Sequence, residues 1–356
     1  LGFSAGWMFL AAKSASAATA ALGFAGYLLD LLGWSASGAM RTWIAIGVCV
    51  ALTAVVAAGI RCSNAVNAAI VSTTLVALIA FVAVGVVVLL RGGAARPSGA
   101  AAVPAVAAAT VAIVRPAGDG PAARLLFATA LMFVAYTGYG RIATLGEEVR
   151  EPRRTIPRAI IATLIITAAL YGSVAVVAVG ALGADGLYAA TVATGAPLEI
   201  AAQRLGAPGL PTLVALGAMT AMLGVLLNLL LGLSRVALAM GRRRDLPTAF
   251  GRLDAAGTTP TAAVLLVGVI VTGLAAIGSI RLAWTFSAFT VLIYYAITNL
   301  AALRLPAASR LYPRAISWLG LVACLGLAVW VPPQVGIAGL GLLGVGLVWR
   351  HVARQR

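Results

Sequence analysis

Charged and metal-ligating side chains are scarce in this sequence of 356 residues. Only 10% of the residues are charged, Asp and Glu together number 9, and the chain has one histidine, His351, and one lysine, Lys13. The histidine lies close to the end of the chain, and no carboxylate falls near the middle of an apolar run. An intramembrane metalloenzyme or aspartyl protease would lack its essential residues. We therefore expect no enzymatic activity, no metal site and no cofactor.

Cysteine is also rare. Cys49, Cys62 and Cys324 are scattered, and their spacing matches neither a metal-binding knuckle nor a disulfide framework, so we interpret all three as packing residues. Lys and Arg outnumber Asp and Glu by 25 to 9, but the arginines lie between apolar runs and not on one continuous face. This distribution argues against nucleic-acid binding and suggests that the arginines set the membrane topology.

Apolar residues, in contrast, make up 62% of the chain, and the mean hydropathy is +1.06. Soluble globular proteins do not have this composition, so we predict an all-α protein that crosses a membrane several times. A helix needs roughly 20 apolar residues to span the hydrocarbon layer. Ten segments are candidates: Gly2 to Leu32, Trp43 to Ile60, Asn67 to Leu90, Leu125 to Val149, Ile160 to Leu182, Leu210 to Met240, Thr261 to Ser279, Leu282 to Leu305, Ile316 to Val331 and Val335 to Trp349. The last two are short, and the alternative for them is a tight hairpin.

The arginines predict an orientation. If all ten segments cross, one side collects seventeen arginines and the other seven. Lys and Arg concentrate in cytoplasmic connections, so both ends of the chain are predicted to be cytoplasmic. The main exception is the stretch from Arg91 to Arg124, which places four arginines outside. Its Ala-, Pro- and Gly-rich composition favours an external loop or a short surface helix. A span at Ala100 to Val114 would reverse every later orientation.

One stretch, FVAYTGYGRIATLGEEVREPRRTIP at residues 133–157, changes character within its length. Irregular backbone at membrane depth survives only where it lines a cavity or is buried in protein. Gly138 and Gly140 favour a hinge, because glycine lets the peptide groups around Val134 to Gly140 turn toward a ligand. The ends of the half-helices would then offer partial charges to a zwitterion. The alternative is that the two glycines only permit close helix packing.

Charged residues of both signs follow this break. Glu147 and Glu148 precede Arg153 and Arg154 at the predicted cytoplasmic exit of the segment. Opposite charges at such an exit are candidates for a cytoplasmic gate that closes through ion pairs. The alternative is a solvated loop, in which surface ion pairs contribute little individually.

Three stretches carry a family resemblance: FVAYTGYGRIATLGEEVREPRRTIPRAI at residues 133–160, LSRVALAMGRRRDLP at 233–247 and TTPTAA at 258–263. The first resembles the sixth helix and following loop of amino acid permeases in the amino acid/polyamine/organocation (APC) superfamily. The other two resemble the end of the eighth helix and the next loop. The resemblance covers essentially the whole chain. It implies a leucine-transporter-like bundle of two five-helix repeats of inverted topology plus two further helices, with the substrate between broken helices one and six.

The resemblance also implies a domain organisation. Residues 1–356 would form a single transmembrane domain with about ten of an expected twelve helices. Residues 1–90 resemble helices three to five, 91–124 an external loop, 125–305 helices six to ten, and 306–356 two C-terminal helices and a tail. The chain starts at Leu1, and no secretory signal is recognisable. We therefore expect it to start partway through a gene, without helices one and two.

A substrate site at the break is implied by the same resemblance. Backbone carbonyls of Phe133, Val134 and Ala135 are expected to meet the substrate amino group. Near the side-chain pocket we expect Tyr136, Thr137 and Gly138. No Asp or Glu accompanies this segment before Glu147. A cationic side chain would find no counter-charge there, which favours a neutral amino acid.

Three residues are candidates for ion coupling. Lys13 lies inside the first apolar run, and an ionisable residue at membrane depth is a functional candidate because its burial is costly unless it is neutral or paired; the alternative is a side chain that snorkels to an interface. Some family members use a lysine in helix five in place of a coupling cation, but Thr74 occupies the matching position here. Thr74 and Ser234 offer hydroxyl oxygens to sodium, unless both bond their own backbone. Proton and sodium coupling both stay open.

Together these features predict secondary active transport of a small neutral amino acid across a bacterial plasma membrane by alternating access. The expected partners are the amino acid and the lipid bilayer, with no nucleic acid and no assigned oligomeric state. A polyamine or amine carrier on the same scaffold would need acidic pocket residues that the sequence does not show. From a different class, the alternatives are a truncated, non-transporting remnant and a partner-binding subunit.

Overall fold

The structure, a computed structural model, describes residues 1–34, 38–59, 64–92, 117–118, 120–138, 149–255 and 257–355. Within these ranges every regular element is a helix. Seven helices are long and apolar enough to cross a membrane: α1 (Gly2–Leu31), α2 (Gly38–Ala57), α3 (Asn64–Leu90), α6 (Pro152–Ala193), α8 (Leu210–Arg242), α10 (Ile280–Leu303) and α12 (Pro333–Gln355). Three apolar helices are shorter: α5 (Pro121–Phe133), α9 (Thr261–Ala276) and α11 (Arg314–Ala328). Each predicted segment overlaps one of these helices, so the predicted all-α architecture is confirmed.

Short helices connect the long ones. α7 (Pro197–Leu205) lies between α6 and α8, and the 3-10 helix η1 (Val134–Tyr136) follows α5 directly. Two further 3-10 helices, η3 (Thr248–Gly251) and η4 (Ala307–Ser309), lie in the connections after α8 and α10. Residues 93–116, most of the predicted external loop 91–124, lie outside the described ranges, and α5 already begins at Pro121.

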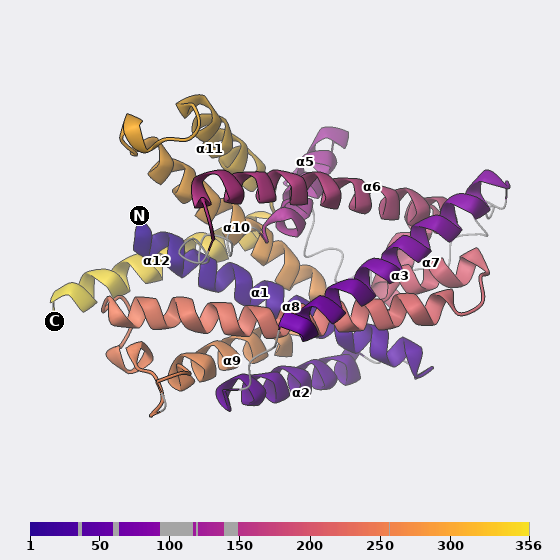
Figure 1. The fold of residues 1–356 in the computed structure, drawn as a ribbon, viewed down its shortest axis with the longest axis horizontal. Coiled ribbons are helices and arrows are strands. Elements are labelled where there is room, and N and C mark those ends of the chain that lie inside the picture. Colours follow the sequence, from indigo (N-terminus) through magenta and orange to yellow (C-terminus); the bar gives the residue numbers. More distant parts are fainter. Residues whose placement is uncertain are drawn as a thin grey trace.

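α1 is the central helix of the bundle. It packs against α8 and α10, and also against α2 and α9. Of the most apolar window of α1, 72% is buried inside the protein, against 6% for α6, which lies on the outside (Figure 1). Small side chains let neighbouring helices approach this closely. The fully buried small residues of α1 are Ala12, Ala15, Ala17, Ala18 and Ala25.

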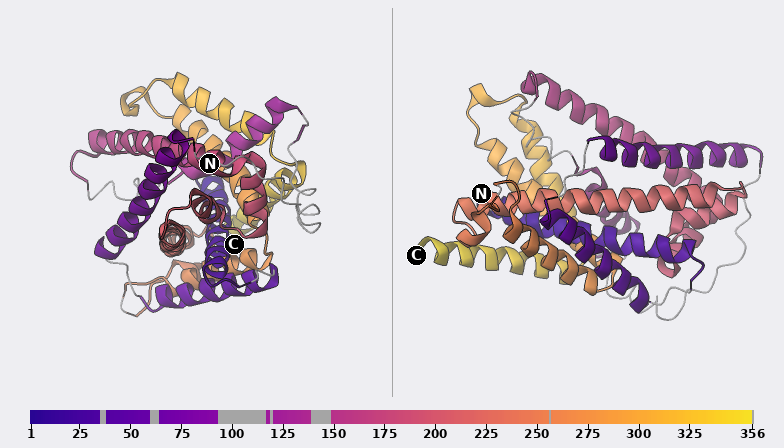
Figure 2. Two further views of the ribbon diagram at one scale, coloured as in Figure 1. Left: turned by 90° about the vertical axis from the view of Figure 1, so that its right-hand side faces the viewer. Right: turned by 60° about the horizontal axis from the view of Figure 1, so that its bottom comes forward.

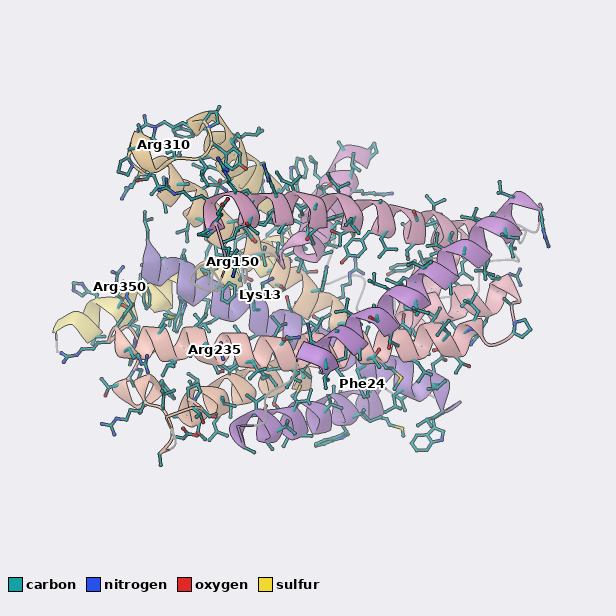
Figure 3. The ribbon with its side chains drawn as sticks, viewed as in Figure 1. Lys13, Phe24, Arg150, Arg235, Arg310 and Arg350 are labelled. Carbon is teal, nitrogen blue, oxygen red and sulfur yellow. The ribbon has the colours of Figure 1, made fainter. Side chains whose placement is uncertain are left out.

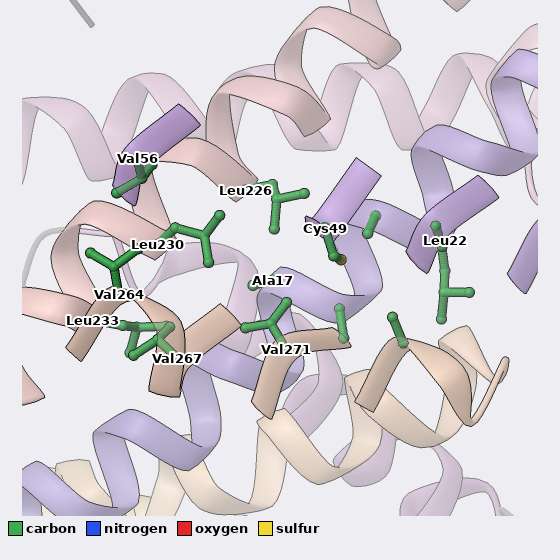
Figure 4. Close-up of a cluster of buried hydrophobic side chains, with 14 of the residues drawn as sticks. Ala17, Leu22, Cys49, Val56, Leu226, Leu230, Leu233, Val264, Val267 and Val271 are labelled. Atoms are coloured by element: carbon green, nitrogen blue, oxygen red, sulfur yellow. The ribbon is translucent and has the colours of Figure 1, made fainter. Parts of the chain in front are cut away.

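A buried apolar cluster joins α1 to α2, α8 and α9 (Figure 4). Its larger members are leucines on α8 and valines on α9, and its α1 members are mostly alanines. Close approach requires glycine at one position, because a Cβ added to Gly268 of α9 would overlap the buried side chain of Thr53 on α2. The labelled side chains in Figure 4 are Ala17, Leu22, Cys49, Val56, Leu226, Leu230, Leu233, Val264, Val267 and Val271.

Both ends of the described chain lie at the same end of the bundle, and α7 lies at the opposite end (Figures 1 and 2). An even number of crossings between the two ends produces this arrangement. Arg310 and Arg350 lie at the end that holds the termini (Figure 3). These two arginines and the two ends of the described chain therefore lie at the same end of the bundle.

Two predicted segments differ from the observed helices. Leu125 to Val149 is not one continuous helix, because α5 ends at Phe133. Ile160 to Leu182 is only the middle of α6, since the helix starts at Pro152 and runs on to Ala193. Hydropathy marks only the apolar part of a helix, whereas a proline in the first turn starts α6 within the arginine-rich region. Gly183 kinks α6 with φ 72° and ψ 166°, a conformation open essentially to glycine alone.

Candidate functional site

The interrupted helix is the centre of the candidate site. α5 ends at Phe133, η1 covers Val134–Tyr136, and a turn follows at Thr137 and Gly138. The Thr137 N–H donates to the Val134 carbonyl oxygen (3.2 Å), and the Thr137 hydroxyl donates to the same oxygen (2.7 Å). The helix thus ends at the position where a break was predicted, and residues 139–148 lie outside the described residues. Gly140, the second predicted hinge residue, lies outside the described residues.

Lys13 reaches the break from α1. Its Nζ donates to the Thr137 hydroxyl oxygen at 2.8 Å and lies 3.4 Å from the Thr137 carbonyl oxygen. Figure 3 labels Lys13 on α1. Lys13 is 8% exposed and Thr137 is 3% exposed. Hydrogen bonds that involve an ionised donor are about twice as strong as neutral ones. The lysine therefore does not snorkel to an interface; it ties the central helix to the turn that ends η1.

A second polar contact joins α1 to α10 one turn from Lys13. The hydroxyl groups of Ser16 and Ser287 lie 2.8 Å apart, and the Ser287 hydroxyl donates to the Ala12 carbonyl oxygen (2.9 Å). Ser287 was not predicted as a site residue. In the sequence it is only a hydroxyl residue within the apolar run of α10, and most such residues bond their own helix. Here the serine bonds across helices instead.

Aromatic rings line the approach to the break. The Phe133 ring packs edge-on against Tyr295 with centroids 5.5 Å apart, Tyr295 contacts Tyr294 at 4.4 Å, and Tyr294 contacts Phe9 of α1 at 5.6 Å. Tyr136 of η1 packs against Tyr171 of α6 in the same edge-on way. These apolar ring faces surround the segment expected to meet the substrate, and sequence reasoning did not identify the tyrosine pair on α10.

A cavity of about 520 Å³ lies between α1 and α8. Its walls include Gly6 and Phe9 of α1 and Met240 of α8, and Arg243 and Asp245 add charges, with Nε and Oδ2 3.5 Å apart. Pockets for small ligands have volumes of about 300–1,000 Å³. The cavity is thus large enough for an amino acid, and Phe9 connects its wall to the aromatic rings at the break.

The other predicted coupling residues bond their own helices. The Thr74 hydroxyl donates to the Ile70 carbonyl oxygen (2.9 Å), with the Gly217 carbonyl oxygen of α8 more distant at 3.5 Å. The Ser234 hydroxyl donates to the Leu231 carbonyl oxygen (3.0 Å). Both hydroxyl groups thus bond the backbone of their own helix, which was the alternative to sodium binding. Among the described residues, no group of three or more His, Cys, Asp or Glu lies together to hold a metal ion.

The predicted gate residues lie only partly within the described chain. Glu147 and Glu148 lie outside the described residues. Arg153 and Arg154 lie in the first turn of α6, where both are exposed. The Arg154 Nη1 lies 3.9 Å from Glu151 Oε2, and both side chains are more than 70% exposed (78% and 74%). An ion pair this exposed contributes little to stability.

A pair of carboxyl groups, also missed from the sequence, lies at the opposite end of α1. Glu199 of α7 is 4% exposed, and its carboxyl group lies within hydrogen-bond reach of Asp30. Burial first, and then the Asp30 charge and hydrogen bond, raise the pKa of Glu199 to about 7. The two residues are far apart in the sequence, so no pattern predicted the pairing.

Comparison with known proteins gives matches over the whole chain. The sequence model of a family described as "Amino acid permease" matches residues 1–346. An uncharacterized transporter of Mycobacterium tuberculosis is 41% identical over 353 residues, which cover 99% of this chain and 73% of the relative. A branched-chain amino acid permease of Lactococcus lactis is 34% identical over 125 residues (35% of this chain, 26% of the relative). A cationic amino acid transporter of Arabidopsis thaliana is 32% identical over 145 residues (41% and 23%).

Proposed function

The chain belongs to the amino acid permease family, and we propose that it is a secondary active carrier of a small neutral amino acid that works by alternating access. Amino acid transport as the general function follows from the family and from the names of its relatives. The narrower proposal rests on one observation, the helix break at Val134–Gly138 to which Lys13 is hydrogen-bonded.

The break supplies groups suited to a zwitterion. The ends of α5 and η1 carry partial charges of the peptide dipoles, and broken helices in transporters use such ends to bind charged substrate groups. The Val134 carbonyl oxygen already accepts two hydrogen bonds from Thr137. We therefore assign the substrate amino group chiefly to the carbonyls of Phe133 and Ala135, with Tyr136, Thr137 and Gly138 beside the substrate side chain.

Lys13 supports a neutral substrate. An ammonium group beside the break repels a cationic side chain at short range, and this repulsion is strong where little water is present. The names of the relatives do not decide the question, because one is a branched-chain amino acid permease and another a cationic amino acid transporter. While Lys13 is protonated, this repulsion argues against the cationic amino acid, and equally against a polyamine.

Lys13 is also the proposed coupling residue. Its ammonium group joins α1 to the turn at Thr137, so the loss of a proton would weaken a charge-assisted hydrogen bond that holds the break. The turn at Gly138 would then be freer to change conformation, which is the movement that alternating access needs. Thr74 and Ser234 are weaker candidates because their hydroxyl groups bond their own helices.

Transport in proteoliposomes tests the proposal. The protein encoded by the full gene is reconstituted, and uptake of labelled leucine, alanine, arginine and putrescine is measured with an imposed proton or sodium gradient. We expect uptake of a neutral amino acid driven by the proton gradient. Uptake of arginine or putrescine alone would overturn the substrate assignment, and dependence on sodium alone would overturn the role of Lys13.

The proposed orientation follows the arginines. Both ends of the chain are assigned to the cytoplasmic side of a bacterial plasma membrane, with α7 outside. The charged residues Glu147, Glu148, Arg153 and Arg154 would then lie at the cytoplasmic exit of the break. We propose that they form a gate there, together with hinge movement at Gly138 and Gly140.

A further inference from the structure

Two carboxyl groups meet where the first turn of α7 lies beside the end of α1. Glu199 lies in the first turn of α7, and its carboxyl group is within hydrogen-bond reach of Asp30. Glu199 Oε2 and Asp30 Oδ2 are buried, and neither has a hydrogen-bond partner among the residues that the structure describes. Two ionised carboxylates at this spacing would repel each other with little water to screen them. The pair must therefore share a proton or hold a cation.

The surrounding elements supply few other charges. The Tyr27 hydroxyl of α1 lies beside Glu199 and within reach of the Leu198 backbone N–H. α3 and the part of α8 before Arg235 also pack near α7, and neither contains a charged residue. The half of α6 that leads into α7 carries Asp185 and Tyr188, and Tyr188 accepts a hydrogen bond from Arg281 of α10 (3.4 Å). Arg204 lies on α7 itself, and Arg41 of α2 approaches Gly195.

The linker that leads into α7 lies directly on α1. A Cβ added to Gly26 of α1 would come within 2.9 Å of the Thr194 carbonyl oxygen, so only glycine permits this approach. Ala196, Ala201 and Ala202 are fully buried by the packing. Ala201 and Ala202 face α3, α6 and α8, so on the α1 side the first turn of α7 is held chiefly by the linker and by the carboxyl pair. A contact this small is sensitive to one buried charge.

We propose that the Asp30–Glu199 pair is a proton-operated latch that holds the first turn of α7 against the end of α1. The proton is placed on Glu199, whose O–H donates to the Asp30 carboxylate. Loss of this proton leaves two negative charges in a site with little water, and α7 is released so that Glu199 reaches water. A metal ion is a poorer occupant than a proton, because no third His, Cys, Asp or Glu joins the pair among the described residues.

The pH range of the latch follows from Glu199. Its pKa is about 7 when α7 is docked, and the ordinary value near 4.5 returns when α7 leaves α1. Between pH 4.5 and pH 7, the docking of α7 is therefore accompanied by the uptake of a proton by Glu199. The docking equilibrium weakens as the pH rises from 4.5 to 7 and changes little above 7. Between pH 5 and pH 8 the expected decrease is on the order of fiftyfold.

Hydrogen exchange of the α7 amides tests the latch in the purified protein in lipid nanodiscs. Protection of residues 197–205, corrected for the intrinsic pH dependence of exchange, should decrease on the order of fiftyfold from pH 5 to pH 8. Glu199→Gln cannot titrate and still offers Asp30 a donor, so α7 should stay protected at pH 8. The matched control is Glu151→Gln, an exposed carboxylate, which should keep the wild-type profile.

Several outcomes would overturn the latch. The latch is overturned if the protection of α7 in the wild-type protein does not change with pH. This measurement needs no variant, so the test stands even if Glu199→Gln fails to fold. A Glu199→Gln protein with the wild-type pH response would also overturn the latch. Restoration of protection at pH 8 by Na⁺ or Ca²⁺ would make the pair a cation site. The hydrogen-exchange experiment does not depend on amino acid uptake. It can therefore contradict the latch without contradicting the proposed transport function.

Discussion

At the scale of single residues, Lys13 links the helix break to the central helix of the bundle. Lys13→Met keeps the length of the side chain and removes its ammonium group. A hydrogen bond to a charged group contributes about 1.5–3 kcal/mol, which corresponds to roughly a tenfold change or more in an equilibrium. We expect the initial rate of amino acid uptake in proteoliposomes to decrease at least about tenfold.

Thr19→Val is the matched control for Lys13→Met. Thr19 lies on the same helix, and its hydroxyl donates to the Ala15 carbonyl oxygen of that helix. Its loss should leave uptake close to the wild-type rate, since no contact to the break is removed. Equal losses in the two variants would show that uptake responds to any polar change on α1, and Lys13 would lose its special role.

Gly138 and Gly268 are expected to respond differently to a side chain. A Cβ at Gly138 meets no described atom within 4 Å, whereas a Cβ at Gly268 would overlap Thr53. Gly138→Leu should abolish uptake, because it fills space beside the break and restricts the backbone, and the melting temperature should not change.

Gly268→Ala should lower the free energy of unfolding by about 1–3 kcal/mol through overpacking. A stable Gly268→Ala protein would contradict the packing of α2 on α9.

The sequence alone could identify part of this site. Lys13 could be identified as a candidate because it is the only lysine and lies in an apolar run. The turn at Thr137 and Gly138 could be identified from the glycines after Tyr136. Their contact could not be predicted, because Lys13 and Thr137 are 124 positions apart and the register of two packed helices depends on all their side chains. Ser287 was missed for the same reason: nothing local distinguishes a serine that bonds another helix from one that bonds its own.

At the scale of elements, the kink of α6 depends on one residue. Gly183 has φ 72° and ψ 166°, so Gly183→Ala should destabilise the protein by about 1–3 kcal/mol. Gly172→Ala in the same helix meets no described atom and should be neutral or stabilising by up to about 1 kcal/mol. Melting temperatures in detergent compare the two variants. A Gly183→Ala protein as stable as Gly172→Ala would mean that α6 straightens without cost.

Hydropathy located the helices better than it located their ends. All ten apolar segments correspond to helices because burial in lipid demands long apolar runs. The ends of α6 were wrong, since its first turns contain arginines that stay helical in the polar region. α7 was not predicted at all. Its nine residues include Glu199 and Arg204, and its stability comes from packing on α6 and α8, not from its own composition.

At the scale of the whole molecule, the placement of both ends on one side predicts a labelling pattern. Trp34 follows α1 and Arg252 follows η3, and both are exposed. In a cysteine-free background, Trp34→Cys should react with a membrane-impermeant maleimide in intact cells. Arg252→Cys should react only after permeabilisation. The reverse pattern would invert the proposed orientation, and reaction of both in intact cells would contradict the number of crossings between them.

The architecture of the bundle was predictable from the family resemblance, but its central element was not. The division of the chain at residues 90, 124 and 305 stays a prediction. The sequence of α1 is no more apolar than that of its neighbours, yet α1 is the helix that the others surround. Its alanines indicate close packing on any face. Which helices pack there depends on contacts between segments far apart in the chain.

The alanines of α1 also limit how this sequence can diverge over evolution. A larger side chain at Ala15, Ala18 or Ala25 would displace several neighbouring helices together, so it could persist only with compensating changes on those helices. Substitutions should therefore accumulate slowly on α1 and in correlated sets. The outer face of α6 is free of this constraint, and its residues should be replaced often by other apolar residues of any shape.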